Sequence, residues 1–251
     1  MKRSVFFVPL LLLIQLLLVQ KMNAQKPKLI VGIVVDQMRW DYLYRYSDRY
    51  GNEGFKRLLK EGFSCENTFI NYIPTYTAPG HTTVYTGAVP SLHGIIGNVW
   101  YDKPTGKTVY CTDDDTVTGV GTTSNAGKMS PKNMWSTSFA DELRLATNFR
   151  NKTIAIALKD RGSILPGGHT ANAAYWIDNS TGGWITSSFY MKNLPSWVQT
   201  FNNRKWPDVY LKQNWTTLYP ITTYNQSTAD SKAYEGNLPG GSNSFPHNTL
   251  K

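Results

Sequence analysis

The apolar residues of this chain gather into short runs that are separated by polar, glycine-rich or proline-rich segments. Residues 28–35 and 153–158 are aliphatic runs of the kind that forms parallel strands buried on both faces. Between them, residues 53–61 show apolar side chains at helical spacing, and a second helix is expected to begin near Ser138. Ser138 and Asp141 have the spacing of a capping box. Aliphatic strands joined by helices predict an α/β fold with a central, mostly parallel sheet flanked by helices.

The pattern changes near residue 171. Residues 173–177 and 184–190 predict the two strands of a hairpin around a polar, glycine-containing turn. The next segment is rich in tryptophan and tyrosine, and the last part of the chain is rich in serine, glycine, proline and asparagine. We therefore expect residues 25–170 to form the N-terminal part of the α/β domain. Residues 171–251 are expected to form an inserted, tryptophan- and tyrosine-rich subdomain.

The first 24 residues have the pattern of a secretory signal peptide. Two basic residues precede an apolar run at residues 5–19, and a small residue, Ala24, stands at the expected cleavage site. The alternative is an uncleaved membrane anchor, because Met22 occupies a position where a small residue is usual. The run is short for a bilayer span, so we expect a periplasmic or secreted protein without a stable membrane anchor.

The chain carries a net charge of +9, which falls to +6 when Lys2, Arg3 and Lys21 leave with the signal peptide. A basic balance suits an anionic substrate such as a phosphate ester. The sequence has no dense run of lysine and arginine of the kind that binds nucleic acid, so nucleic acid is not an expected partner. Cys65 and Cys111 either form one disulfide or remain two free thiols, and their spacing does not decide between these alternatives.

Residues 73–87 contain the densest candidate chemistry. Pro79 is accepted in the first turn of a helix, so Thr77 is predicted to be the N-cap of a short helix that ends at Gly87. The free N–H groups of a helix N-terminus attract anions, and a hydroxyl there is placed to attack a bound phosphoryl group. The alternative is that Thr77 only caps the helix, because its hydroxyl needs a base or a metal to become nucleophilic. Asp36, directly after the first aliphatic run, is a candidate metal ligand or, alternatively, a turn-capping residue.

Three segments resemble, in order along the chain, motifs of the phosphodiesterase/nucleotide pyrophosphatase branch of the alkaline phosphatase superfamily. Residues 34–43 resemble its first metal-ligand strand, and residues 74–79 resemble its nucleophile loop. Residues 86–98 resemble the segment that ends in a substrate-binding asparagine. The resemblance implies an alkaline phosphatase-like α/β domain and a hydrolase that uses two zinc ions (Zn2+).

The same resemblance implies roles for individual residues. Thr77 would attack phosphorus and form a phosphothreonine intermediate, with Thr75 as the rival nucleophile on the same face of an extended loop. Asp36 and Thr77 would bind zinc. Asn98 would donate its amide to a phosphoryl oxygen.

Residues 158–169 resemble the phosphate-monoesterase group within that branch, the PafA-type alkaline phosphatases. In that group a lysine and an arginine at this spacing bind phosphoryl oxygens, which implies the same role for Lys159 and Arg161. If the segment is extended, these two side chains point to one side and Asp160 faces away. A monoester dianion has one more negative oxygen than a diester, so the pair favours phosphate monoesters as substrates. The alternative is a solvated charge cluster at the end of a strand.

The resemblance also implies further zinc ligands, which are aspartates and histidines at a characteristic spacing. This sequence lacks residues at that spacing. None of the four histidines directly follows an aspartate, and none lies four residues after one. We therefore expect an N-terminal fragment of a zinc-dependent alkaline phosphatase that binds zinc weakly and turns over poorly by itself. One alternative is a phosphodiesterase or nucleotide pyrophosphatase, and another is a non-catalytic exported protein that binds phosphate or a partner. The sequence leaves the oligomeric state open.

Overall fold

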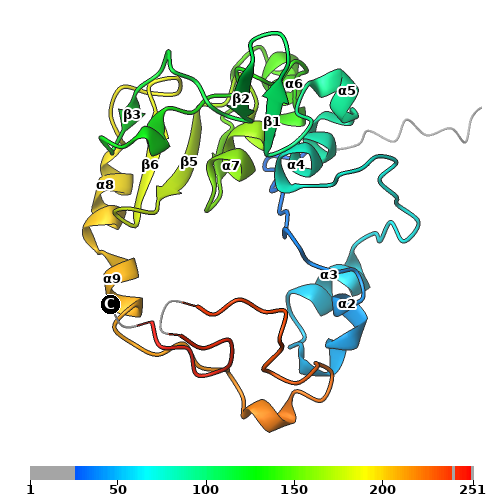
Figure 1. Ribbon diagram of the computed structural model, residues 1–251. Coiled ribbons are helices and arrows are strands. Elements are labelled where there is room, and N and C mark those ends of the chain that lie inside the picture. The colour runs from blue at the N-terminus through cyan, green and yellow to red at the C-terminus, as the bar shows by residue number, and fades with distance from the viewer. Residues whose placement is uncertain (1–25, 239–240, 250–251) are drawn as a thin grey trace, which may run out of the picture. The chain divides into compact units, whose positions relative to one another are not determined.

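The computed structural model describes residues 26–238 and 241–249 (Figure 1). The predicted signal peptide, residues 1–24, therefore lies outside the described residues. The chain divides after Val35 into two compact units, and each is described by itself. No helix in the described part of the chain combines the length and the hydropathy that a membrane span requires.

The first unit contains the aliphatic run for which a strand was predicted. Residues 28–35 form no regular helix or strand and belong to no sheet within the described residues, so the prediction of a strand here is wrong. A strand requires a neighbour that exchanges backbone hydrogen bonds with it, whatever its side chains. The apolar side chains of the run are exposed, Leu29 to 77% and Ile33 to 78%.

The second unit begins at Asp36 and contains a four-stranded sheet with the order β3–β6–β5–β4. The strands are β3 (Gly119–Val120), β4 (Ile154–Ile156), β5 (Ala173–Asp178) and β6 (Gly183–Ser187). Strands β4 and β5 are parallel, whereas β6 is antiparallel to both β5 and β3. The predicted α/β class is confirmed. Parallel pairing, which was expected to dominate, is limited to β4 and β5 among the described residues.

Three of the predicted strand regions contain strands, with bounds that differ from the expected ones. Strand β5 is one residue longer than predicted, whereas β4 and β6 are shorter. Strands β5 and β6 are the predicted hairpin, and β4 is the central part of the run predicted at residues 153–158. Strand β5 lies beyond the domain boundary expected at residue 170 and pairs with β4, which lies before it. The division of the chain at residue 170 stays a prediction.

Helices cover both faces of this sheet. Successive side chains of a strand point to opposite faces, so the apolar strands present buried side chains on both. Helix α7 (Asp160–Gly167) packs on β4 and β5, and α4 (Thr77–Thr86) packs in turn on α7. A buried apolar cluster joins α7 to one face: Ile164, Ala174, Trp176 and Ile185. A second cluster joins α8 (Ser196–Asn203) to the other face: Ala173, Tyr175 and Val198. The stacking of α4 on α7 brings the two predicted phosphate-binding segments into one part of the fold.

Helix α6 (Phe139–Ala146) begins with the predicted capping box. Ser138 Oγ accepts a hydrogen bond from Asp141 N at 3.2 Å, and Asp141 Oδ2 accepts one from Ser138 N at 2.9 Å. Each group satisfies an N–H that the helix itself leaves free. The box therefore fixes the start of α6, which packs on α4 and α7.

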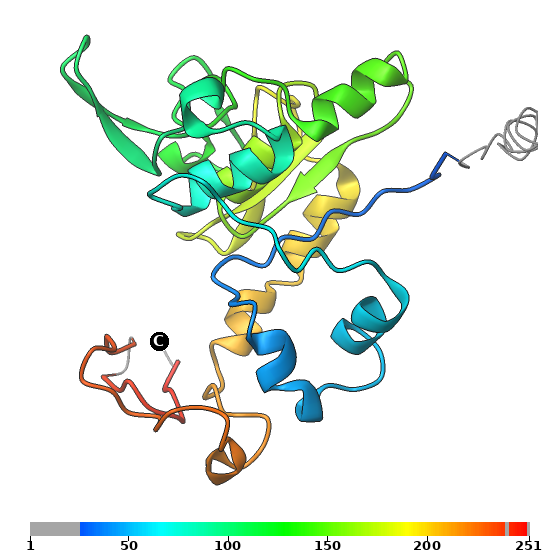
Figure 2. The ribbon, with the colours of Figure 1, turned by 90° about the vertical axis from the view of Figure 1, so that its right-hand side faces the viewer.

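A two-stranded hairpin of β1 (Val99–Asp102) and β2 (Lys107–Tyr110) leads away from the α4 region, and it projects at the upper left of Figure 2. The helix predicted at residues 53–61 is confirmed as α3 (Phe55–Glu61). The remaining elements are α2 (Tyr42–Arg45), η1 (Ser47–Arg49), α5 (Pro90–His93), η2 (Asn125–Gly127), α9 (Trp206–Tyr210) and η3 (Ile221–Thr223). The two cysteines are free thiols, with Cys65 exposed and Cys111 buried.

Candidate active site

Helix α4 carries the predicted nucleophile at its first position. Tyr76 is the N-cap with an extended backbone (ψ 166°), so Thr77 is the first helical residue and not the predicted N-cap. The helix begins one residue earlier than predicted. The predicted end is confirmed, because Gly87 adopts a left-handed conformation (φ 67°) and donates its N–H to Thr83 O at 2.9 Å. No side chain caps the N-terminus of α4, so the Thr77 hydroxyl is not used as a cap.

The Thr77 hydroxyl instead contacts Asp36. Thr77 Oγ1 donates a hydrogen bond to Asp36 Oδ2 at 3.0 Å, and the rival Thr75 is exposed and makes no such contact. The next residue, Gln37, adopts a left-handed backbone (φ 60°), which costs a residue with a side chain about 1–2 kcal/mol. The turn after Asp36 therefore adopts a costly conformation beside the hydroxyl.

The pair offers part of a metal site. Carboxylate and hydroxyl oxygens are suitable ligands for a divalent cation, and those of Asp36 and Thr77 are close enough to share one. A tetrahedral site needs two further ligands. No group of three or more histidine, cysteine, aspartate or glutamate side chains in the described part of the chain is placed to hold a metal. The two residues thus fit a metal as part of a larger donor set.

Asn98 is held at the N-terminus of α4. Its Oδ1 accepts a hydrogen bond from Ala78 N at 2.8 Å. Because that partner is a donor, the contact fixes which end of the amide is oxygen. The Nδ2 group then faces elsewhere with two N–H donors and no hydrogen-bond partner among the described residues. In the same first turn the N–H of Thr77 also lacks a partner among those residues, so both groups are available to an anion.

A buried histidine joins α4 to the segment that carries Asn98. His93 Nδ1 accepts a hydrogen bond from Ile95 N at 3.1 Å, so the ring proton sits on Nε2, which donates to Thr83 Oγ1 at 3.1 Å. Burial lowers the pKa of His93, which agrees with a neutral ring. The next residue, Gly94, is left-handed (φ 80°) and has the Trp135 ring over it, where a Cβ atom would lie 2.7 Å from a ring carbon. His93 is therefore structural here, and it positions Asn98 through a tight turn.

Lys159 and Arg161 lie at the start of α7, and the expected extended geometry is wrong. Lys159 is the N-cap, whereas Asp160 and Arg161 are in the first helical turn, so side chains two positions apart do not share a face. Asp160 also does not face away, because its Oδ1 accepts a hydrogen bond from Tyr110 Oη at 2.7 Å and lies 3.9 Å from Arg161 Nη1. The Lys159 side chain is exposed and has no partner among the described residues.

Arg161 is largely buried, with 15% of its side chain exposed. Its Nη1 donates a hydrogen bond to Tyr110 Oη at 2.8 Å, and its Nε is buried without a partner in the described part of the chain. Burial raises the pKa of Tyr110, and the nearby Asp160 carboxylate raises it further, so the phenol stays protonated. The sequence reasoning missed Tyr110, because nothing in its local pattern indicates a partner in α7.

The predicted site residues are thus only partly brought together by direct contacts. Asp36 meets Thr77, and Asn98 meets the residue after Thr77. Arg161 is connected through Tyr110, which packs on a buried cluster shared by α4, α7 and the hairpin: Ala78, Ile95, Cys111, Met134 and Leu165. Lys159 makes no side-chain contact with any of the others in the described structure.

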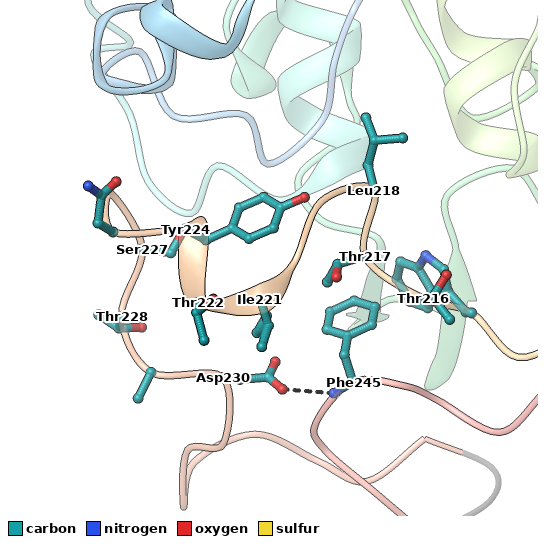
Figure 3. A pocket seen from close by; sticks show the side chains of 13 residues that line it. Thr216, Thr217, Leu218, Ile221, Thr222, Tyr224, Ser227, Thr228, Asp230 and Phe245 are labelled. Atoms are coloured by element: carbon teal, nitrogen blue, oxygen red, sulfur yellow. Dashed lines mark hydrogen bonds between the residues drawn. The ribbon is translucent and has the colours of Figure 1, made fainter.

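A cavity of about 710 Å³ lies in another part of the second unit (Figure 3). Its lining includes the aromatic rings of Trp215, Tyr224 and Phe245 and several threonine hydroxyls. Asp230, at its edge, accepts a hydrogen bond from Phe245 N at 2.8 Å. The cavity contains none of the predicted site residues, so the candidate site rests on the contacts around Thr77.

The chain matches the family described as type I phosphodiesterase/nucleotide pyrophosphatase over residues 30–235. It is 59% identical over 223 residues to alkaline phosphatase PhoV of Synechococcus elongatus, which covers 88% of this chain and 40% of that protein. It is 54% identical over 234 residues to alkaline phosphatase PafA of Elizabethkingia meningoseptica, which covers 92% of this chain and 43% of that protein. A Myroides odoratus protein named calcium-transporting ATPase is 59% identical over 228 residues, which covers 90% of this chain and 42% of that protein.

Solved structures give a similar result. A crystal structure of wild-type alkaline phosphatase PafA matches with a TM-score of 0.86 at 54% identity, covering 90% of this chain and 44% of that one. A PafA variant with substitutions at a threonine, an asparagine, a lysine and an arginine matches with a TM-score of 0.86 at 52% identity, covering 89% of this chain and 44% of that one. The chain spans about two fifths of the length of the curated relatives it matches.

Proposed function

The chain belongs to the type I phosphodiesterase/nucleotide pyrophosphatase family, and we propose that the full-length protein is an exported, zinc-dependent alkaline phosphatase that hydrolyses phosphate monoesters. The hydrogen bond of 3.0 Å from Thr77 Oγ1 to Asp36 Oδ2 carries this proposal. It joins a hydroxyl that does not cap its helix to a carboxylate that suits a metal. The names of two similar proteins, alkaline phosphatases PhoV and PafA, support the same reaction class.

Thr77 is the nucleophile in this proposal. Asp36 Oδ2 holds the hydroxyl hydrogen, which leaves an oxygen lone pair free to face an incoming phosphorus. Once the hydroxyl has lost its proton to water, the bond from Oγ1 to phosphorus forms as the bond to the leaving alkoxide breaks, and the alkoxide takes a proton from water. The product is a phosphothreonine that water later hydrolyses. A zinc ion held by Asp36 and Thr77 together with further ligands would lower the pKa of the hydroxyl and stabilise the alkoxide.

Four groups of the described chain would stabilise the charge on the phosphoryl oxygens. Asn98 Nδ2 and the Thr77 N–H are donors held at the start of α4, where the helix dipole also favours an anion. Arg161 adds a permanent positive charge in a largely buried position, where it is worth more than at the surface. Lys159, which is exposed, would add a more mobile charge. Two cations suit the dianion of a monoester better than the monoanion of a diester.

Similar proteins support these assignments. The PafA variant structure carries substitutions at the same four residue types, with its lysine and arginine two positions apart as Lys159 and Arg161 are here. The relative named calcium-transporting ATPase is compatible with this class, because ATP hydrolysis also transfers a phosphoryl group to water.

The test of the nucleophile uses the full-length protein supplied with zinc and p-nitrophenyl phosphate as substrate. Thr77→Ala should lower kcat by about 10³-fold or more, because it removes the oxygen that forms the covalent bond. Thr75→Ala is the matched control, since Thr75 is exposed on the same loop and should be dispensable. Mass spectrometry of acid-quenched protein should find the added phosphate on Thr77. Loss of activity in Thr75→Ala with retention in Thr77→Ala would move the nucleophile to Thr75.

The substrate class has its own test. Replacing Lys159 and Arg161 together by alanine should lower kcat/KM for p-nitrophenyl phosphate by about 10-fold more than kcat/KM for bis-p-nitrophenyl phosphate. An equal loss for both substrates would contradict the preference for monoesters and favour a phosphodiesterase.

Export is the remaining part of the proposal. It rests on the sequence pattern of residues 1–24, with cleavage after Ala24. N-terminal sequencing of the protein recovered from outside the cytoplasm should begin at Gln25. An intact N-terminus that stays with the membrane would indicate an uncleaved anchor instead.

A further inference from the structure

We propose that Tyr110 is a positioning residue that holds the guanidinium of Arg161 ready for a phosphoryl oxygen and ties it to Asn98. This inference rests on the proposed function, because it assumes that Arg161 binds phosphate. Tyr110 itself contacts no substrate in this proposal. It acts through the hydrogen bond that its hydroxyl accepts from Arg161 Nη1.

The Tyr110 hydroxyl takes part in two hydrogen bonds, as the donor in one and as the acceptor in the other. It donates to Asp160 Oδ1 at 2.7 Å and accepts from Arg161 Nη1 at 2.8 Å. Because the single phenolic hydrogen is taken up by Asp160, an oxygen lone pair is directed to Arg161. Among the described residues this is the one hydrogen bond that the Arg161 side chain makes. The guanidinium would otherwise be placed only by packing, including its position 6.0 Å from the centre of the Tyr110 ring.

The phenol also keeps Asp160 and Arg161 from forming a close ion pair. Their nearest charged atoms, Asp160 Oδ1 and Arg161 Nη1, are 3.9 Å apart. A direct bidentate pair has N–O distances near 2.8 Å and would occupy two of the N–H groups of the guanidinium. With Tyr110 between them, the carboxylate accepts hydrogen bonds from the phenol and from the backbone N–H of Arg161 and makes none with the guanidinium. Nη2 of Arg161 has no partner in the described part of the chain and is left for an anion.

The hairpin connects this arrangement to Asn98. Tyr110 is the last residue of β2 and lies opposite Val99, which directly follows Asn98. The next residue, Cys111, donates its N–H to Asn98 O at 3.0 Å. The open end of the hairpin therefore fixes the backbone of Asn98 and also carries the phenol that fixes Arg161. Two groups proposed to contact the same phosphoryl group are held by one rigid element.

Tyr110 is suited to this role over a wide pH range. Burial raises the pKa of its phenol, so its hydroxyl stays protonated in the alkaline range. It packs on the buried cluster that includes Ala78 of α4 and Leu165 of α7. A phenylalanine at this position keeps the packed ring and removes only the hydroxyl, so Tyr110→Phe is expected to fold.

The experiment measures kcat and KM for p-nitrophenyl phosphate, and competitive inhibition by inorganic phosphate, in the full-length protein supplied with zinc. Tyr110→Phe should lower kcat/KM by about 10-fold and weaken inhibition by phosphate by a similar factor, because Arg161 loses its orientation. In an Arg161→Ala background the same substitution should have almost no further effect. Tyr101→Phe is the matched control on the same hairpin, since Tyr101 is 63% exposed, and it should behave as the wild type.

The outcomes separate the inference from the function on which it rests. If Arg161→Ala lowers monoester hydrolysis but Tyr110→Phe does not, the positioning role is refuted and the phosphatase proposal stands. Equal losses from Tyr110→Phe with and without Arg161 would show a merely structural effect and would also refute it. If Arg161→Ala has no effect on monoester hydrolysis, both the role of Arg161 and this inference are wrong.

Discussion

The buried carboxylate of Asp141 gives the sharpest prediction about stability. Asp141 has no exposed surface and accepts five hydrogen bonds. Three donors are backbone N–H groups, those of Ser138 at 2.9 Å, His169 at 3.2 Å and Thr170 at 2.7 Å. The side chain thus joins the start of α6 to the loop that follows α7. Asp141→Asn keeps the volume but replaces one acceptor oxygen by a group that can only donate.

The magnitude follows from the donors that lose their acceptor. A buried N–H without a partner costs about 1–3 kcal/mol, and Asp141→Asn leaves at least one in that state while it turns charge-assisted bonds into neutral ones. We expect a loss of about 3–4 kcal/mol in the free energy of unfolding, because the region is too closely packed to bring water to every donor. Gly168 illustrates the packing, since a Cβ atom there would overlap the Asp141 carboxylate.

The pH dependence of this loss has a definite sign. Burial would raise the pKa of Asp141, but the contacts with His169, Ser138 and Thr170 outweigh it and hold the pKa well below its usual range. A depressed pKa in the folded state contributes stability above the unfolded pKa of about 3.9, and that stability is lost as the pH falls below it. The Asp141 carboxylate, whose Oδ2 lies 3.6 Å from His169 Nδ1, raises the pKa of His169, so the contribution of His169 is full below about pH 6.5 and falls as the pH rises. The pair should stabilise the fold most between about pH 4 and pH 6.5.

The assay is urea unfolding of the full-length protein, followed by tryptophan fluorescence at a series of pH values. Glu142→Gln is the matched control, because Glu142 is exposed on the same helix, and it should change the free energy of unfolding by less than about 0.5 kcal/mol. The difference between wild type and Asp141→Asn should shrink as the pH falls below about 4. A difference that stays constant from pH 3 to pH 7 would refute the charge-based reasoning. A loss in the free energy of unfolding no larger than that of Glu142→Gln would refute the claim that Asp141→Asn leaves a buried N–H without an acceptor.

Three further predictions concern single sites. Asn98→Asp keeps an acceptor oxygen for the Ala78 N–H at the start of α4, so the melting temperature should be nearly unchanged. The new carboxylate would repel the anionic substrate, so kcat/KM for p-nitrophenyl phosphate should fall by about 10²-fold or more. Gly94→Ala should lower the free energy of unfolding by about 1–3 kcal/mol in urea titrations, because its backbone is left-handed and its Cβ atom would meet Trp135. Burial raises the pKa of the Cys111 thiol to about 12, so iodoacetamide at pH 8 should alkylate Cys65 in the folded protein and leave Cys111 unmodified. Peptide mapping would show this, and modification of Cys111 without denaturant would contradict its burial.

The features that sequence reasoning predicted best are those whose cause lies within a few residues. The capping box at Ser138 and the left-handed end of α4 at Gly87 both formed as predicted. Each depends on one side chain and the backbone next to it. The prediction for Lys159 and Arg161 at the start of α7 was wrong for a related reason. It assumed an extended segment, in which side chains two positions apart point the same way, but the chain has already entered a helix there.

Strand formation shows a different limit. Residues 28–35 and 153–158 are similarly aliphatic, and β-propensity does not separate them. The second run contains a strand because β5 lies parallel to it, whereas the first has no paired neighbour in the described part of the chain. Pairing between distant segments therefore decided the outcome, and a pattern within one segment contains no information about it.

The same reasoning separates the site residues from those that hold them. Asp36 and Thr77 are 41 positions apart, and they were placed together only because both lie in motifs of one family. Tyr110 is 51 positions from Arg161 and lies in no such motif, so neither spacing nor resemblance indicated their contact. A motif identifies groups that touch the substrate, because the chemistry restricts the residue types there. Residues that orient those groups are restricted only by geometry, and for that reason Tyr110 became visible only when the end of β2 and the start of α7 were seen in contact.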